Sequence, residues 1–369
     1  MRITIKIGSN VLTRGDGSLD VTRMSALVDQ VAELRRQGIE VLMVSSGAMA
    51  SGRSELKNIT TGKMDAVDQR QLYSAVGQAK LINRYYELFR DHGIAVGQVL
   101  TMKENFGTRR HYLNQRNCVS VMLDNGVIPI INENDTVSVT ELMFTDNDEL
   151  SGLIATMMDC DALVILSNID GLYTGNPSSP EAKLIPSVEP GKDISEYIST
   201  EKSGFGRGGM QTKSNIAQKV AQEGIAVLIA NGKREHILCD LLPTIQHVTE
   251  KRHPMPAGSV PCTVFLPAEV EVSSVKKWIA HSEGFAKGAI HLNAGASEKI
   301  QGEQAASILP VGITKVEGQF EPHDIISVVD DKGQKIGVGR TDYSSAEVTS
   351  AMGKRDQRPV IHYDFLYLE

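Results

Sequence analysis

Short apolar segments alternate with longer amphipathic segments along the first two thirds of the chain. The apolar segments have the length and β-branched composition of buried strands, and they cover residues 3–7, 39–44, 94–100, 127–131, 162–166 and 225–230. Helical spacing of apolar residues marks residues 21–37, 69–93, 112–124, 150–158 and 210–223. Strands that alternate with helices form parallel sheets with helices on both faces. The pattern therefore predicts a mostly parallel, open α/β sheet sandwiched by helices. Residues 225–230 would form the closing strand of this sheet.

The pattern changes in the last third of the chain. Residues 249–258 gather charged residues, prolines and glycine, a composition typical of a boundary or an exposed link. Beyond Trp278 the apolar elements become short and are separated by glycines, which is the rhythm of a small β-barrel. We therefore expect an α/β domain over residues 1–255, a linker and lead-in over 256–284, and a small β-barrel-like domain over 285–367.

Composition excludes several classes of protein. The chain has 369 residues, of which 41% are hydrophobic and 22% charged, as in an ordinary globular protein with a sizeable core. A net charge of −7 argues against bulk electrostatic binding to nucleic acid or to an anionic membrane. The four cysteines are widely spaced, so we expect reduced thiols, without a disulfide framework or a zinc site. The first strand begins at once, and no apolar run reaches the roughly 18 residues of a membrane span, so a cytoplasmic protein is expected.

Polar side chains gather at two places that lie close together in the sequence. Residues 132–135 read Asn-Glu-Asn-Asp and follow an apolar strand, while residues 145–148 read Thr-Asp-Asn-Asp and precede an apolar helix. In open α/β sheets, ligands bind where the strands end and the next helices begin. Two surface turns and a helix cap are the simpler interpretation. Two such clusters beside buried segments favour a ligand site.

Two lysines lie beside turns of small residues. Lys6 is near the end of the first strand, two residues before Gly-Ser-Asn, and Lys213 is in the first turn of a helix that follows the glycine-rich segment 204–209. A second turn of small residues, 45–48, also opens a helix, where free N–H groups can meet an anion. No strand precedes the glycine-rich segment, and no Gly-Lys is followed by Ser or Thr, so neither a Rossmann loop nor a Walker A loop is predicted. The alternative for Lys6 is a solvated lysine on an edge strand, and the alternative for the glycine-rich segment is a mobile linker.

These residue types suit phosphoryl transfer. Its transition state spreads negative charge over the moving phosphoryl group, so fixed cations perform most of the catalysis and carboxylates hold the metal and orient the lysines. The sequence contains neither a G-x-S-x-G elbow nor an H-E-x-x-H motif. The residues alone therefore indicate a phosphate-handling α/β enzyme.

Several motifs, taken together and in order, resemble the amino acid kinase family. They are residues 6–12 (KIGSNVL), 45–48 (SSGA), 131–135 (INEND), 146–148 (DND) and 206–213 (GRGGMQTK). The C-terminal part, about residues 285–367, is similar to a PUA domain. The INEND turn with a trailing PUA-like domain resembles the members that phosphorylate glutamate. The resemblance implies that ATP and L-glutamate give γ-glutamyl phosphate and ADP with Mg²⁺, the first step of proline biosynthesis.

The same resemblance implies a role for each matching residue. Lys6 and Lys213 would neutralise the moving phosphoryl group, and Asp148 would hold both lysines in place. Glutamate would be bound by Ser46, Asp135 and Asn147, with Asn132 and Asp146 nearby. The nucleotide would contact Lys6, Ser167, Asn168, Arg207, Gly208, Gly209, Met210, Gln211, Thr212 and Lys213. The chain departs from the family at Ser167-Asn168, where Thr-Asp is usual, and at Arg207, where a small or hydroxyl residue is common.

The resemblance also implies a homodimer or homotetramer and feedback inhibition by proline. PUA domains often bind RNA, but residues 285–369 hold nine Lys and Arg against twelve Asp and Glu, a net charge of −3. A surface that follows phosphates should be basic, so this composition argues against RNA binding and for a structural or regulatory role. The alternatives are another kinase of the family, acting on aspartate, acetylglutamate, carbamate or a nucleoside monophosphate, and an RNA-binding regulatory protein with an inactive kinase fold.

Overall fold

The computed structural model describes residues 1–58, 63–138, 144, 146–194, 209–254, 260–269, 274–280, 282–302 and 305–368. The chain divides into two compact units. The first unit comprises Met1–Lys103 and Asn114–Glu271, and the second comprises Glu104–Leu113 and Val272–Glu369. None of the described helices combines the length and the apolar character that crossing a bilayer requires.

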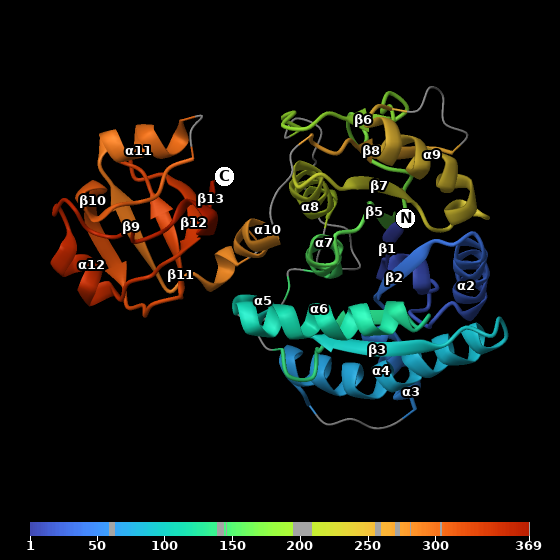
Figure 1. The fold of residues 1–369 in the computed structure, drawn as a ribbon. Coiled ribbons are helices and arrows are strands. Elements are labelled where there is room, and N and C mark those ends of the chain that lie inside the picture. The colour runs from blue at the N-terminus through green and yellow to red at the C-terminus, as the bar shows by residue number, and fades with distance from the viewer. Residues whose placement is uncertain are drawn as a thin grey trace. The chain divides into compact units, whose positions relative to one another are not determined.

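The first unit is built on an eight-stranded sheet with the order β3-β4-β2-β1-β5-β7-β8-β6 (Figure 1). The strands are β1 (Arg2–Ile7), β2 (Glu40–Ser45), β3 (Val96–Thr101), β4 (Ile128–Glu133), β5 (Ala162–Ser167), β6 (Ser187–Val188), β7 (Ala226–Asn231) and β8 (Cys262–Phe265). Every pairing in this sheet is parallel except that of β7 with β8. The predicted mostly parallel sheet is confirmed. The prediction that residues 225–230 close it is wrong, because β8 and β6 continue the sheet beyond β7.

Helices of the first unit connect these strands. They are α1 (Ser9–Leu12), α2 (Val21–Arg36), α3 (Ala48–Glu55), α4 (Ala66–Arg90), α7 (Asn147–Met157), α8 (Met210–Gln222) and α9 (Ile237–Lys251), and α6 (Arg109–Asp124) begins in the second unit's residues. The sequence pattern predicts most of them to within a few residues. The prediction omits α1 and α9, although the apolar residues of α9 have helical spacing (Ile237, Leu238, Leu241, Leu242, Ile245 and Val248).

The central strand β1 divides its side chains between the two faces of the sheet. Ile3, Ile5 and Ile7 are fully buried in a core that also contains apolar residues of α2, α4 and α9. Successive side chains of a strand point to opposite faces, so Thr4 and Lys6 lie on the other face. That face is covered by α7, which packs against β1, β2, β4 and β5. The alternation in β1 therefore directs the Lys6 side chain toward α7.

Helices α3 and α4 pack with their backbones in contact. A Cβ atom placed on Gly77 of α4 would lie 1.8 Å from the carbonyl oxygen of Ala48, and one on Gly52 of α3 would lie 1.8 Å from the carbonyl oxygen of Tyr73. No side chain fits into such distances, so glycine is required at both positions. This contact fixes α4 beside the small-residue turn between β2 and α3, where Gly47 has a left-handed φ of 110°.

The second unit contains a five-stranded sheet with the order β10-β9-β11-β12-β13. Its strands are β9 (Gly288–Leu292), β10 (Ile313–Gly318), β11 (Ile325–Val329), β12 (Lys335–Arg340) and β13 (Leu366–Leu368), and its helices are α5 (Glu104–Gly107), α10 (Ser274–Ala280), α11 (Ala294–Gln301) and α12 (Ser345–Ala351). Short 3₁₀ turns cover Glu283–Phe285, Pro310–Gly312 and Tyr363–Phe365. The pairings are antiparallel except β9 with β11.

Residues 104–113 leave the α/β unit and join the C-terminal one, although they lie between β3 and α6 in the sequence. The indole Nε1 of Trp278 donates a hydrogen bond of 2.9 Å to the carbonyl oxygen of Phe106, and both side chains are buried. Arg109 lies over the Trp278 ring, 5.7 Å from its centroid. The sequence pattern gives no sign of this excursion, because it depends on a contact between distant parts of the chain.

Candidate active site

A cavity of about 810 Å³ opens in the first unit where the parallel strands end. Its wall includes residues at or just after the carboxyl ends of β1, β2, β4 and β5, together with the starts of α3, α7 and α8. In a parallel sheet these strand ends share one edge, which is where open α/β sheets bind ligands. The expected residues that line it are Lys6, Ser46, Asn132, Asp135, Asp146, Asn147, Asp148, Ser167, Asn168, Gly209, Met210 and Lys213.

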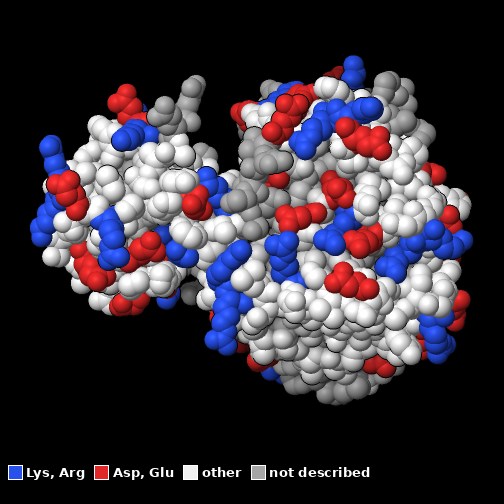
Figure 2. Space-filling model, in the orientation of Figure 1, with Lys and Arg blue, Asp and Glu red and all other residues white. Residues whose placement is uncertain are grey.

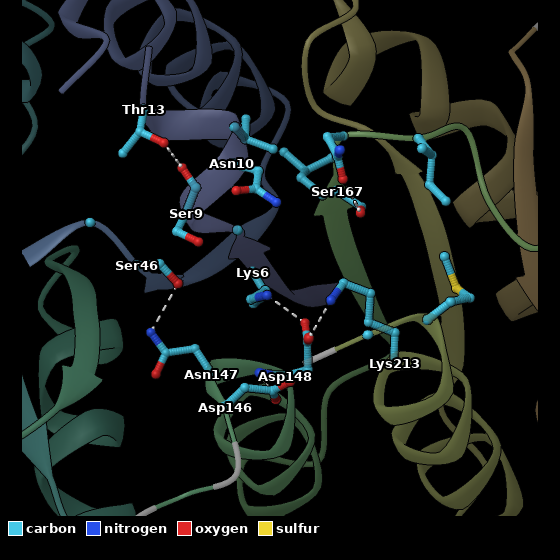
Figure 3. Close-up of a pocket in the computed structure, with 18 of the residues that line it drawn as sticks. Lys6, Ser9, Asn10, Thr13, Ser46, Asp146, Asn147, Asp148, Ser167 and Lys213 are labelled. Atoms are coloured by element: carbon cyan, nitrogen blue, oxygen red, sulfur yellow. Dashed lines mark hydrogen bonds and ion pairs between the residues drawn. The ribbon is translucent and has the colours of Figure 1, made fainter. Parts of the chain in front are cut away.

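Two lysines meet one carboxylate in this cavity (Figure 3). The Nζ atom of Lys6 lies 2.5 Å from Oδ1 of Asp148, and the Nζ atom of Lys213 lies 2.9 Å from Oδ2 of the same residue. Asp148 is fully buried and Lys6 is 4% exposed. Burial opposes the ionisation of Asp148, but the charges of the two lysines outweigh it and lower its pKa to about 2. The ionised Asp148 carboxylate therefore holds both ammonium groups at the cavity wall.

Asp146 caps helix α7 beside these charges. One carboxylate oxygen, Oδ1, accepts hydrogen bonds from the backbone N–H groups of Asp148 (2.8 Å) and Glu149 (3.1 Å), as the sequence predicts for a residue that begins a helix. The other oxygen, Oδ2, is buried and has no hydrogen-bond partner among the described residues. Burial and the neighbouring Asp148 charge together raise the pKa of Asp146 to about 6.

Amide side chains connect the strand ends on the other side of the cavity. The Asn147 side-chain nitrogen donates to Oγ of Ser46 (3.1 Å) and to Oδ1 of Asn132 (2.9 Å). Asn132 in turn donates to Oε1 of Gln78 on α4, at 2.8 Å. Ser45, next to Ser46, shares a hydrogen bond of 2.7 Å with the buried Tyr85 hydroxyl, also on α4. These bonds hold the end of β2, the end of β4 and the start of α7 in one arrangement.

A buried arginine on α4 holds the carboxylates that follow β4. Arg70 donates from Nε to Oδ1 of Asp135 at 2.7 Å and from Nη2 to Oε2 of Glu133 at 2.8 Å. Its Nη2 also pairs with Oδ1 of Asp135. Arg70, Glu133 and Asp135 all line the cavity. They form an acidic corner of the site, with one positive group between two negative ones.

The opposite end of the cavity is formed by the turn after β5 and the start of α8. Ser167 and Asn168 line it together with Gly209, Met210 and Lys213, whereas Gln211 and Thr212 are not part of the wall. Arg207 and Gly208 lie outside the described residues. Tyr173 also lines this end, and nearby Asp170 is paired with Arg234 through two contacts of 2.8 Å. The hydrogen bond from Arg234 is the largest influence that lowers the pKa of Asp170.

Comparison with known proteins identifies the α/β unit. Residues 1–231 match the sequence model of the amino acid kinase family. The chain belongs to the amino acid kinase family. Residues 288–363 match the PUA domain, so the expected fold, a sheet of this family followed by a PUA domain, is confirmed.

Full-length relatives agree with this assignment. The chain is 64% identical over 368 residues to glutamate 5-kinase of Bacteroides thetaiotaomicron, with 100% of this chain and 98% of the relative covered. It is 45% identical to glutamate 5-kinase of Chlorobaculum tepidum, covering 100% and 97% of the two chains. It is 38% identical to glutamate 5-kinase of Pelobacter propionicus, covering 97% and 91%. The similarity thus extends over both units.

Sequence reasoning missed the contribution of α4 to this amino acid kinase site. Arg70, Gln78 and Tyr85 lie on the buried side of the helix, among its apolar residues. A charged residue on the apolar stripe of an amphipathic helix is a signal for a buried partner, because arginine is almost never buried unpaired. The sequence could have shown that Arg70 needs an acid, but not that the acid would be Asp135.

The described residues contain no cluster of three or more His, Cys, Asp or Glu side chains that could hold a metal ion by themselves. Mg²⁺ commonly keeps several waters and is held by one or two carboxylates together with the phosphates of a substrate. The unpartnered Oδ2 of Asp146 is one oxygen of the required kind. The donor set therefore suits a metal that arrives with a nucleotide.

Proposed function

We propose that this chain transfers the γ-phosphoryl group of ATP to the γ-carboxylate of L-glutamate, the first step of proline biosynthesis. The full-length similarity to proteins named glutamate 5-kinase supports the substrate pair. The structural observation that carries the proposal is the convergence of Lys6 and Lys213 on the buried Asp148 at the wall of the cavity. Fixed positive charge at this place is what phosphoryl transfer requires.

The reaction needs no general base. The γ-carboxylate of glutamate is ionised at neutral pH, so one of its oxygens can attack the γ-phosphorus directly. The new bond joins this oxygen to phosphorus, and the bond between phosphorus and the β,γ-bridging oxygen breaks with both electrons leaving on ADP. The products are γ-glutamyl phosphate and ADP. The protein therefore acts by positioning the reactants and by stabilising charge.

Lys6 and Lys213 supply that charge. Asp148 contacts both ammonium groups through its two oxygens and fixes them in place before the nucleotide arrives. Because Asp148 holds both ammonium groups at the cavity wall, each of them can contact the negative phosphoryl group there. The lowered pKa of Asp148 keeps it ionised throughout the neutral range.

Glutamate would occupy the acidic and amide-lined side of the cavity. Asp135 offers a carboxylate to the α-ammonium group, and Ser46 and Asn147 offer a hydroxyl and an amide for the carboxylates. Asn132 holds the Asn147 amide at 2.9 Å, so it orients that residue. Ser167, Asn168, Gly209 and Met210 would receive the nucleotide, as would Arg207, Gly208, Gln211 and Thr212 in the same segment.

Mg²⁺ would be held mainly by the nucleotide phosphates, with Oδ2 of Asp146 as the protein oxygen able to join them. When bound, it would neutralise phosphate charge and make ADP a better leaving group. A cation beside Asp146 would also offset the burial that raises the pKa of this residue.

Two further proposals rest on the family resemblance: assembly as a homodimer or homotetramer, and inhibition by proline. Proline carries the same α-carboxylate and a positively charged amine, so it can compete for the acidic corner. We assign the PUA domain a structural or regulatory role rather than RNA binding. Figure 2 shows acidic and basic side chains interspersed on the visible face of the C-terminal unit, at the left, in keeping with its net charge of −3.

A hydroxylamine trap tests the proposed reaction. γ-Glutamyl phosphate reacts with hydroxylamine to give a coloured hydroxamate, so ATP, Mg²⁺ and L-glutamate should produce it together with equimolar ADP. Aspartate, acetylglutamate, carbamate and nucleoside monophosphates serve as parallel acceptors. Turnover with one of these and not with glutamate would assign a different kinase of the family. ADP release with none of them would leave the regulatory alternative.

A further inference from the structure

Arg70 is a buried cation on α4 that the proposed mechanism does not use. It lies in the cavity wall, 5% exposed, and the carboxylates of Glu133 and Asp135 contact it. Burying three ionised groups is costly unless their charges and hydrogen bonds match closely. The contacts among these three groups therefore have to offset the cost of burying them.

The contacts on Asp135 are one-sided. Both Nε and Nη2 of Arg70 bind the same oxygen, Oδ1. No hydrogen bond to the second oxygen, Oδ2, is present among the described residues. An ionised carboxylate can accept hydrogen bonds at both oxygens. The arginine thus holds Oδ1 of Asp135, a residue of the cavity wall, and makes no described contact with Oδ2.

Glu133 extends this arrangement to the start of α7. Its Oε2 accepts from Arg70 at 2.8 Å, and its Oε1 accepts from the backbone N–H of Phe144 at 3.0 Å. Phe144 is buried and lies two residues before Asp146. Arg70 is therefore the link between α4, the turn after β4 and the segment that leads into α7.

Asp135 lies in the cavity wall, and Arg70 contacts one of its two carboxylate oxygens. An α-ammonium group carries one positive charge and three hydrogen-bond donors, so it suits the other oxygen of this carboxylate. A guanidinium suits the positioning role better than an ammonium, because its planar fork holds two carboxylates in fixed directions.

We propose that Arg70 is a positioning residue that holds Asp135 so that its free Oδ2 receives the α-ammonium group of the amino acid substrate. This inference rests on the proposed function. It assigns to Arg70 and Asp135 the selection of an α-amino acid over the corresponding simple diacid. Arg70 acts through Asp135, and the residues that stabilise the phosphoryl group are unaffected.

The test compares L-glutamate with glutarate, which lacks only the α-ammonium group. In the full-length enzyme, KM for glutamate and Ki for glutarate as a competitive inhibitor are measured for the native chain, Arg70→Met and Arg70→Lys. Arg84→Met is the matched control, because Arg84 lies on the same helix and pairs with Glu87 at 2.9 Å with both side chains more than a third exposed.

We expect Arg70→Met to raise KM for glutamate by tenfold or more, because the variant loses one charge-assisted contact to the α-ammonium group. Ki for glutarate, KM for ATP and kcat should each change less than about threefold. Arg70→Lys should keep part of the discrimination, and Arg84→Met should leave it intact. Equal weakening of both ligands, or unchanged discrimination in Arg70→Met, would overturn the inference. If Arg70→Met does not fold, Arg70→Lys decides the test. An Arg70→Lys enzyme that discriminates between glutamate and glutarate as well as the native enzyme does would overturn the inference. A native chain without glutamate-dependent ADP release would contradict the proposed function itself.

Discussion

Replacing Asp148 by asparagine separates its two contacts with almost no change in volume. The native carboxylate binds Lys6 with one oxygen at 2.5 Å and Lys213 with the other at 2.9 Å. An asparagine side chain keeps one acceptor oxygen and turns an N–H₂ group toward the second lysine. It can therefore hold one ammonium group but not both.

The expected fall in kcat follows from the loss of one of the two fixed ammonium groups. Losing one aligned donor to a charged transition state lowers kcat by about 10²–10³, or about 2.7–4 kcal/mol. We therefore expect Asp148→Asn to lower kcat by about 10²-fold or more. KM for glutamate should change less than about threefold, because Asp148 contacts the lysines and not the acidic corner. Stability should also fall, by about 3–5 kcal/mol, since two buried ammonium groups lose their counter-ion.

Initial rates of hydroxamate formation, measured well below the unfolding temperature of the variant, give kcat and KM. A second measurement distinguishes positioning from direct contact. If Asp148 acts only through the lysines, the double variant Lys6→Met/Asp148→Asn should lose much less than the product of the two single losses. A kcat for Asp148→Asn within threefold of the native value, or fully multiplicative losses, would refute this reasoning.

Four other predictions concern single residues. Lys6→Ala or Lys213→Ala should each lower turnover by about 10²-fold, and an unchanged kcat would remove that lysine from the mechanism. Asp135→Ala should mainly raise KM for glutamate, and a change confined to KM for ATP would reverse the assignment of the two halves of the cavity. In the free enzyme the pKa of Asp146 is raised to about 6, so Asp146 is ionised above that pH and protonated below it. Since kcat/KM reports the free enzyme, kcat/KM should fall as the pH drops through 6, and Asp146→Asn should remove this limb from the pH profile. Gly77→Ala should destabilise the first unit by about 3 kcal/mol or more, an overpacking cost, and an unchanged midpoint of thermal unfolding would show that α3 and α4 can separate cheaply.

The sequence by itself determines the alternating elements and most of the cavity wall. Strands such as residues 3–7 and helices such as 21–37 follow from local periodicity, which backbone geometry imposes within a few residues. The two polar clusters around residues 132–135 and 145–148 stand out because polar side chains interrupt buried segments there. Parallel strands then bring their ends to one edge, so a shared site could be expected before any contact was known.

Local sequence patterns do not decide which charges meet. The family resemblance implies that Asp148 contacts both lysines, and the tertiary structure makes these contacts. The sheet order places β1 between β2 and β5, which brings Lys6 to α7 and lets Lys213 of α8 reach the same carboxylate. The partner of Arg70 and the passage of residues 104–113 into the C-terminal unit likewise depend on contacts between distant segments. Local patterns show that a buried charge needs a partner, but the partner is chosen by packing, because only the folded chain fixes distances between residues far apart in the sequence.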